Sequence, residues 1–150
     1  MSYAKSKGTK YESDIVKYLT DNGFTTVRRV PLSGAAGDKG DLWIGENPTI
    51  PNIVIECKNY AKTLTYKQVE DFVQEAYTEY RNATKSSDVD NYSALLCVKI
   101  LNLGTADSWL VWKNKNNITI RCRLGDIISK IPVCASESER IAELYKLLKE

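Results

Sequence analysis

Two short apolar runs carry charged residues that could do chemistry together. Asp41 precedes the run Leu42–Ile44, and Glu56 and Lys58 end the run that begins at Ile53. Both runs contain β-branched or aromatic residues, and the segment between them contains turn-forming Pro and Asn, which predicts two strands joined as a hairpin. Because side chains alternate along a strand, Glu56 and Lys58 share one face. A hairpin can bring Asp41 to the same place.

Two carboxylates and an amine in one place could form a hydrolytic metal site. A hard divalent cation such as Mg²⁺ takes oxygen ligands and keeps several waters. Asp41, Glu56 and the backbone carbonyl of Cys57 could supply those oxygens, which Mn²⁺ would also fit. Lys58 could orient or help deprotonate a metal-bound water, whose acidity the cation raises. A strand-initiating Asp and a solvated Glu–Lys pair explain each residue alone, but the set on apolar strands favours phosphodiester hydrolysis.

The order of residues in the first half of the chain resembles that of PD-(D/E)XK nucleases. Asp41, followed by Glu56-Cys57-Lys58 after an apolar strand, is similar to their signature, with Gly40 in place of a loosely kept proline. A longer ordered set, similar to archaeal-type Holliday-junction resolvases, comprises Lys7-Gly8, Glu12, Gly23-Phe24, Val27-Arg28 and Ile55–Lys58. The resemblance spans about residues 7–80. It implies a restriction-endonuclease-like fold and a Mg²⁺-dependent endodeoxyribonuclease acting on branched DNA, four-way junctions above all.

Glu12 lies on the apolar stripe of a predicted helix over about residues 3–22. Tyr11, Ile15 and Leu19 recur at helical spacing, and Asn22-Gly23 ends the pattern. The helix dipole alone favours a glutamate near a helix start. The alternative is that Glu12 leans over the sheet toward the metal site. The resemblance favours this alternative, because a Glu at this place belongs to the metal site of the resembling resolvases.

Basic and polar side chains near these elements are candidates for DNA contacts. The net charge is only +2, so binding to nucleic acid must rely on local clusters. Lysines are usually solvated surface, but cations beside an anionic-substrate site suit phosphate contacts that position a duplex. The candidates are Lys7, Lys10, Arg28, Arg29, Ser33, Lys39, Lys62, Lys67 and Gln68.

Several of these candidates have a second interpretation. Arg28 matches a functional arginine of the resembling family and is preferred over Arg29, although Ser13 stands where that family commonly has another arginine. Ser33 is similar to a loop serine that helps those resolvases act on junctions, but its glycine-rich loop equally suits a plain connector. Gln68 completes a Thr-x-x-Gln capping box, which explains it without a role in DNA binding.

The remaining pattern predicts an α/β sandwich with a mixed central sheet. The expected elements are strands over 25–30, 92–98, 109–112 and 118–123, helices over 65–80 and 136–148, and a loop over 82–91. By length the chain is one nuclease domain, residues 1–150, with a core over about 7–123 and a C-terminal helix over about 136–149. Arg121 and Arg123 share a face of the last strand. These arginines could contact a phosphate, but charged residues on an edge strand more commonly serve to block aggregation.

Composition excludes several other functions. The chain has no histidine, and its four cysteines lie far apart without C-x-x-C spacing. This excludes a histidine base and argues against a structural zinc site. The absence of a secretory or membrane-length apolar run predicts an intracellular protein, in a host cell if a virus encodes it, with neither a membrane partner nor a small-molecule cofactor.

Paired nicks in a four-way junction need two symmetric sites, so we expect a homodimer. Two alternatives stay open. One is a restriction or repair nuclease acting on duplex or flapped DNA. The other is a structure-specific DNA-binding module with a vestigial metal site. A structural or interaction protein would leave the polar cluster on apolar strands unexplained.

Overall fold

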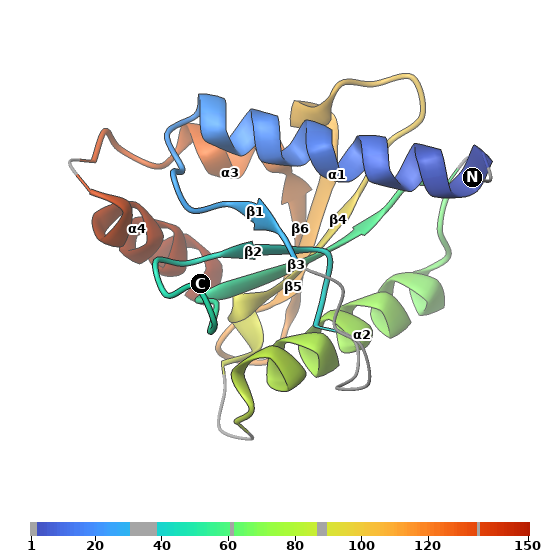
Figure 1. Cartoon of the computed structure of the whole chain (residues 1–150). Coiled ribbons are helices and arrows are strands. Elements are labelled where there is room, and N and C mark those ends of the chain that lie inside the picture. The colour runs from blue at the N-terminus through green and yellow to red at the C-terminus, as the bar shows by residue number, and fades with distance from the viewer. Residues whose placement is uncertain (1–2, 31–38, 61, 87–89, 135) are drawn as a thin grey trace.

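The computed structural model describes residues 3–30, 39–60, 62–86, 90–134 and 136–150, with side chains from residue 8 onward. It is an α/β structure with a mixed six-stranded sheet flanked by helices, which confirms the predicted fold class (Figure 1). No helix within the described ranges is long and apolar enough to span a membrane. The elements in chain order are α1 (Tyr3–Asp21), β1 (Arg28–Arg29), β2 (Leu42–Ile44), β3 (Ile53–Lys58), α2 (Tyr66–Thr84), β4 (Ala94–Val98), β5 (Trp109–Lys113), β6 (Thr119–Arg123), α3 (Leu124–Ser129) and α4 (Glu137–Lys149), with short 3₁₀ turns η2 (Asn91–Ser93) and η3 (Thr105–Asp107).

The six strands lie in the sheet in the same order as in the chain. Neighbouring strands are antiparallel except β3 and β4, which are parallel with Lys58 opposite Val98. A parallel pair needs a long crossover, and α2 forms it. The carboxyl ends of β3 and β4 therefore meet at one end of the sheet. This is the end at which an open α/β sheet commonly binds its ligand.

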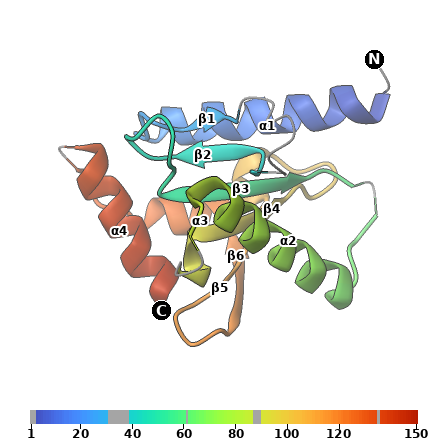
Figure 2. The ribbon, with the colours of Figure 1, turned by 60° about the horizontal axis from the view of Figure 1, so that its bottom comes forward.

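The two faces of the sheet bury different helices (Figure 2). On one face Ile53 and Ile55 join a core that includes apolar residues of α1, α3 and α4. On the other face Val54 and Leu96 pack against residues of α2. The period-two alternation along β3 therefore decides which helix each side chain meets. Glu56 and Lys58 share the parity of Val54, which directs them to the α2 side.

Two element predictions were wrong and one helix was missed. The second helix does not end near Tyr80 but continues to Thr84, because Ala83 still buries against the sheet, so the predicted 82–91 loop starts later. The helix α3 was not predicted, because its six residues are too few to show a helical period, although Leu124 and Ile127 are buried. The first strand contains only Arg28 and Arg29 rather than residues 25–30.

Candidate active site

Asp41 and Glu56 meet across the pair of strands β2 and β3. Leu42 is paired with Ile55, so Asp41 and Glu56 are the next residues facing each other along this antiparallel pair. Asp41 Oδ2 accepts a hydrogen bond of 2.8 Å from the N–H of Cys57. The Asp41 N–H donates to the carbonyl oxygen of Ile55 at 3.2 Å. The hairpin predicted from the sequence therefore brings the two carboxylates together.

Gly40 lets the chain approach β3 closely just before Asp41. Its φ is +94°, a conformation that residues with a side chain rarely adopt. A Cβ atom at this position would lie 2.3 Å from Val54 Cγ1 and 3.4 Å from Glu79 Oε2. The position occupied by proline in the resembling signature thus requires glycine here, because no room for a side chain remains above β3.

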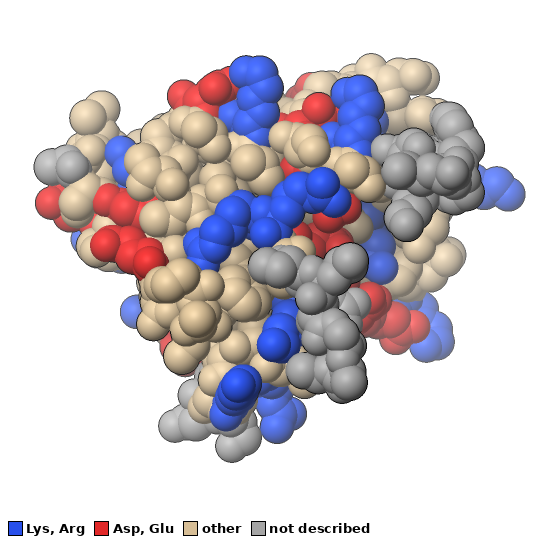
Figure 3. Space-filling view, viewed as in Figure 1, with Lys and Arg blue, Asp and Glu red and all other residues tan. Residues whose placement is uncertain are grey.

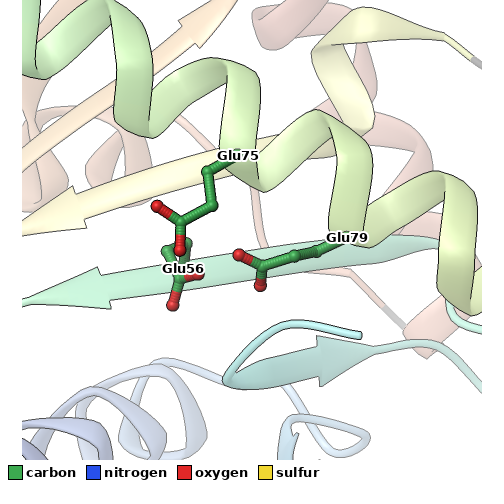
Figure 4. A group of neighbouring side chains, drawn as sticks. All are labelled: Glu56, Glu75 and Glu79. Atoms are coloured by element: carbon green, nitrogen blue, oxygen red, sulfur yellow. The ribbon is translucent and has the colours of Figure 1, made fainter. Parts of the chain in front are cut away.

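The helix α2 adds two glutamates, Glu75 and Glu79, that the sequence analysis did not identify (Figure 4). Carboxylate oxygens of Glu56, Glu75 and Glu79 lie within 4.8 Å of one another. Glu56 and Glu79 are only 4% and 2% exposed. A signal for Glu79 was present in the sequence, since it interrupts the apolar stripe formed by Ala76 and Tyr80. Glu12 interrupts the apolar stripe of α1 in the same way.

The electrostatics of this cluster favour a positive partner. Burial raises the pKa of Glu56 far above its ordinary value, and the neighbouring Asp41 and Glu79 carboxyl groups raise it further. Several buried carboxylates cannot all be ionised side by side without a compensating charge. The ligand atoms are all oxygens, which is the donor set that a hard divalent cation prefers. Glu56, Glu75 and Glu79 therefore fit such an ion, while Asp41 as a metal ligand stays a prediction.

Glu12 lies on α1 beside this cluster. Its carboxylate is 3.8 Å from Arg29 Nε, and its side chain is mostly buried. Burial raises the pKa of Glu12, the negative charge of Asp41 raises it further, and Arg29 opposes both. Glu12 is thus close enough to Asp41 to feel its charge. This placement agrees with the expectation that Glu12 leans over the sheet, while its role in metal binding stays a prediction.

Lys58 projects from the end of β3 toward α2. Its Nζ lies 3.5 Å from Glu75 Oε1 and 4.5 Å from the centroid of the Phe72 ring. Burial lowers the pKa of Lys58, but the charges of Glu56 and Glu75 outweigh it, so the net pKa is raised. The amine is therefore an ammonium at neutral pH, suited to donating hydrogen bonds to a water or a phosphate.

Cys57 contributes its backbone rather than its thiol. Its N–H holds Asp41, while its side chain faces the α1 core. Burial raises the pKa of the Cys57 thiol well above its ordinary value, and nearby Cys97 and the acidic residues add to this effect. A thiolate nucleophile is therefore disfavoured. The carbonyl of Cys57 as a metal ligand stays a prediction.

The two arginines of β1 have different surroundings. Arg28 donates hydrogen bonds of 2.7, 2.8 and 2.9 Å to the carbonyl oxygens of Thr26, Gly45 and Asn47, and its guanidinium lies over Trp43. It therefore braces the β2–β3 connection. Arg29 instead lies beside Glu12, next to the carboxylate cluster. The structure thus places Arg29, rather than the preferred Arg28, at the candidate site.

The other predicted DNA contacts are mostly engaged locally. Lys10 pairs with Asp14 and Lys67 with Asp71, each at 3.1 Å, on exposed helix surfaces. Figure 3 shows basic side chains crossing one face of the molecule beside acidic ones.

Gln68 forms both bonds of the predicted capping box with Thr65. Lys39 accepts a bond from Trp43 Nε1 through its backbone carbonyl. Lys62 borders a pocket described below. Ser33 and the side chain of Lys7 lie outside the described residues. Contact of these residues with DNA stays a prediction.

Comparison with known proteins agrees with this geometry. The chain matches the family described as phage putative PDDEXK endonuclease over residues 3–91. No curated protein and no solved structure matches it. The matched segment extends from α1 through α2 and so contains Glu12, Asp41, Glu56 and Lys58, together with both α2 glutamates. From this match over more than half of its length, the chain belongs to the PDDEXK endonuclease family and is a nuclease.

Proposed function

We propose that this nuclease is a divalent-metal-dependent endodeoxyribonuclease whose ion is held by Asp41, Glu56 and the α2 glutamates. The observation that carries the proposal is the approach of the Glu56, Glu75 and Glu79 carboxylates to within 4.8 Å of one another, in a largely buried position. A purely structural protein would be destabilised by such a cluster. A cation supplies the charge that the cluster lacks.

Each residue has a distinct part in this mechanism. The bound cation would supply a Lewis acid and a water of lowered pKa. Asp41 has one oxygen fixed by the Cys57 N–H, which orients its other oxygen. Glu75 holds the Lys58 ammonium, so that this group can donate a hydrogen bond to the attacking water or to a phosphate oxygen. Glu12 with Arg29 borders the site on the α1 side.

We further propose four-way DNA junctions as the substrate and Mg²⁺ as the ion, with Mn²⁺ as a substitute. The resemblance of residues 7–80 to archaeal-type resolvases supports the substrate. A two-fold homodimer would supply the two symmetric nicks. The phage description of the family supports action inside a host cell. Duplex or flapped DNA is the second candidate substrate, and a non-catalytic junction-binding module is the third possibility.

A cleavage assay separates these possibilities. A labelled four-way junction, a linear duplex and a flap would be incubated with Mg²⁺ or EDTA and the wild type, Glu56→Ala or Lys58→Ala. Glu143→Ala and Lys146→Ala are matched controls, because this pair on α4 lies outside the candidate site. We expect paired nicks in the junction that need metal. We expect a loss of about 100-fold or more for both site variants and none for the controls.

The other outcomes are equally informative. Equal cutting of all three DNAs would retain the nuclease and remove the junction specificity. Tight junction binding without cutting in Mg²⁺ would favour the binding module. Unchanged cutting by Glu56→Ala would place the catalytic centre elsewhere.

A further inference from the structure

A pocket lies at the same end of the sheet as Lys58, outside the carboxylate cluster. Its volume is about 250 Å³, and its walls come from the segment after β3, the start of α2, the segment after β4, and strands β5 and β6. The residues important for its chemistry are Tyr60, Lys62, Val98, Leu101, Trp109 and Arg121. The mechanism above uses none of them.

The lining combines aromatic and cationic groups. Tyr60 is 46% exposed and Trp109 is half-buried. Arg121 lies with its guanidinium carbon 4.4 Å from the centroid of the Trp109 ring. Of the described residues around the pocket, none is acidic. Aromatic faces next to cations are the usual surroundings of an unpaired nucleotide, because the base stacks on the rings and the phosphate meets the cations.

The pocket is linked to the candidate active site by two stacked rings. Tyr60 stacks on Phe72 with 5.9 Å between ring centroids and 7° between their planes. Lys58 Nζ lies over the Phe72 ring, 4.5 Å from its centroid. A DNA strand with one phosphate near Lys58 could therefore place a neighbouring nucleotide against Tyr60. The volume suits one base rather than a duplex.

We propose that this pocket binds an unpaired nucleotide of the DNA strand that is cut, with its base between Tyr60 and Trp109 and its phosphate near Lys62 and Arg121. The inference rests on the proposed nuclease function. It adds a reason for preferring branched or unpaired DNA, because a fully paired duplex offers no free base to the pocket.

The structure provides two matched pairs of variants. Arg121 and Arg123 lie on the same strand face and over the same Trp109 ring, at 4.4 and 4.3 Å. Only Arg121 is among the described residues that line the pocket, while Arg123 donates to the carbonyl oxygen of Asp107. Leu101 and Leu103 are likewise both exposed, at 53% and 41%, and only Leu101 is among these lining residues.

Binding would be measured with a short single-stranded oligonucleotide containing 2-aminopurine, whose fluorescence changes when the base stacks. EDTA prevents cleavage, so this readout does not depend on activity. We expect Arg121→Ala and Leu101→Asp to weaken binding about tenfold and to reduce the fluorescence change. Arg123→Ala and Leu103→Asp should bind like the wild type. A thermal melt would establish that all four variants fold.

Equal binding by both members of each pair, or no binding by the wild type, would overturn the pocket assignment. Binding of free dTMP without binding of the oligonucleotide would overturn it as well, because the ligand would then not be a DNA strand. Failure of the nuclease proposal would be recognised separately, by a wild type that cuts no DNA in Mg²⁺ while these binding differences persist.

Discussion

Asp41 Oδ2 accepts a 2.8 Å hydrogen bond from the backbone N–H of Cys57. Cys57 lies on β3 between Glu56 and Lys58, the other two residues of the signature. This single bond fixes the first half of the signature to the second. In the proposed mechanism the other Asp41 oxygen would bind the cation. The geometry of the site therefore depends on the pairing of β2 with β3 and not only on the side chains.

Asp41→Asn and Asp41→Ala should separate these two roles. The Asn oxygen can still accept from Cys57, so we expect Asp41→Asn to keep most of the stability while losing cleavage by about 100-fold or more. Asp41→Ala should lose cleavage and also about 1.5 to 3 kcal/mol of stability, because a hydrogen bond to a charged group is removed. Thermal melts and cleavage rates measure both. Equal stabilities of the two variants would contradict the structural role of this bond.

Metal binding should stabilise the protein, and Glu79→Gln should alter that response. Without metal we expect Glu79→Gln to melt at a higher temperature than the wild type, since it removes a buried carboxylate beside Glu56. Saturating Mg²⁺ at about 100 times its dissociation constant should add about 2.7 kcal/mol to the wild type. The variant should gain much less.

Asp71→Asn is the control for this experiment, because Asp71 lies on the same helix in an exposed pair with Lys67. Melting with EDTA and with Mg²⁺ would be compared for all three proteins. An equal Mg²⁺ response in the wild type and Glu79→Gln would remove Glu79 from the metal site.

Gly40→Ala should destabilise the fold at the entrance to β2. The added Cβ would lie 2.3 Å from Val54 Cγ1, in a backbone with φ of +94°. We expect a loss of about 2 kcal/mol or more and a melting temperature lower by about 4 to 8 °C. Gly104→Ala is the control, because nothing lies within 4 Å of its Cβ position and its φ is −75°. Similar melting of both variants would contradict the close approach at Gly40.

Glu137 should make stability depend on acid pH. It accepts bonds from the N–H groups of Thr25 and Thr26 at 3.0 and 2.8 Å and from the Thr26 hydroxyl, and it pairs with Arg140. Burial alone raises the pKa of Glu137, but these bonds outweigh it and lower the net pKa. A lowered folded pKa means that the stabilisation is complete above the unfolded pKa of about 4.3 and is lost as pH falls through the folded value.

Glu137→Gln should therefore lower the free energy of unfolding at pH 7 by about 1 to 3 kcal/mol, because its amide cannot accept from all of these donors. It should also flatten the loss of stability below about pH 4.3. Denaturant unfolding at several pH values measures both effects. Glu143→Gln, in an exposed pair with Lys146, should leave the profile unchanged. A parallel pH profile for Glu137→Gln and the wild type would contradict the assignment.

The sequence by itself determined the hairpin that joins Asp41 to Glu56 and the face on which Glu56 and Lys58 lie. It also predicted the capping box of α2. These features follow from local periodicity: a period of two decides the face of a strand, and cap residues bond to their own helix. Glu12 was a candidate from its place on the apolar stripe, the family resemblance favoured a role at the site, and the structure brings it close enough to Asp41 for that charge to raise the pKa of Glu12.

Only the tertiary structure decided which distant residues lie together at the candidate site. Glu75 and Glu79 reach Glu56 because α2 crosses that face of the sheet as the connection between parallel strands, and a crossing angle is not encoded in a local period. The same packing directs Arg28 to the backbone of the β2–β3 connection and Arg29 to Glu12 beside the candidate site, although the two are adjacent in the sequence. The distances from Glu56 to the α2 glutamates and from Glu12 to Arg29 join elements that are far apart in the chain. A local sequence pattern therefore cannot predict them.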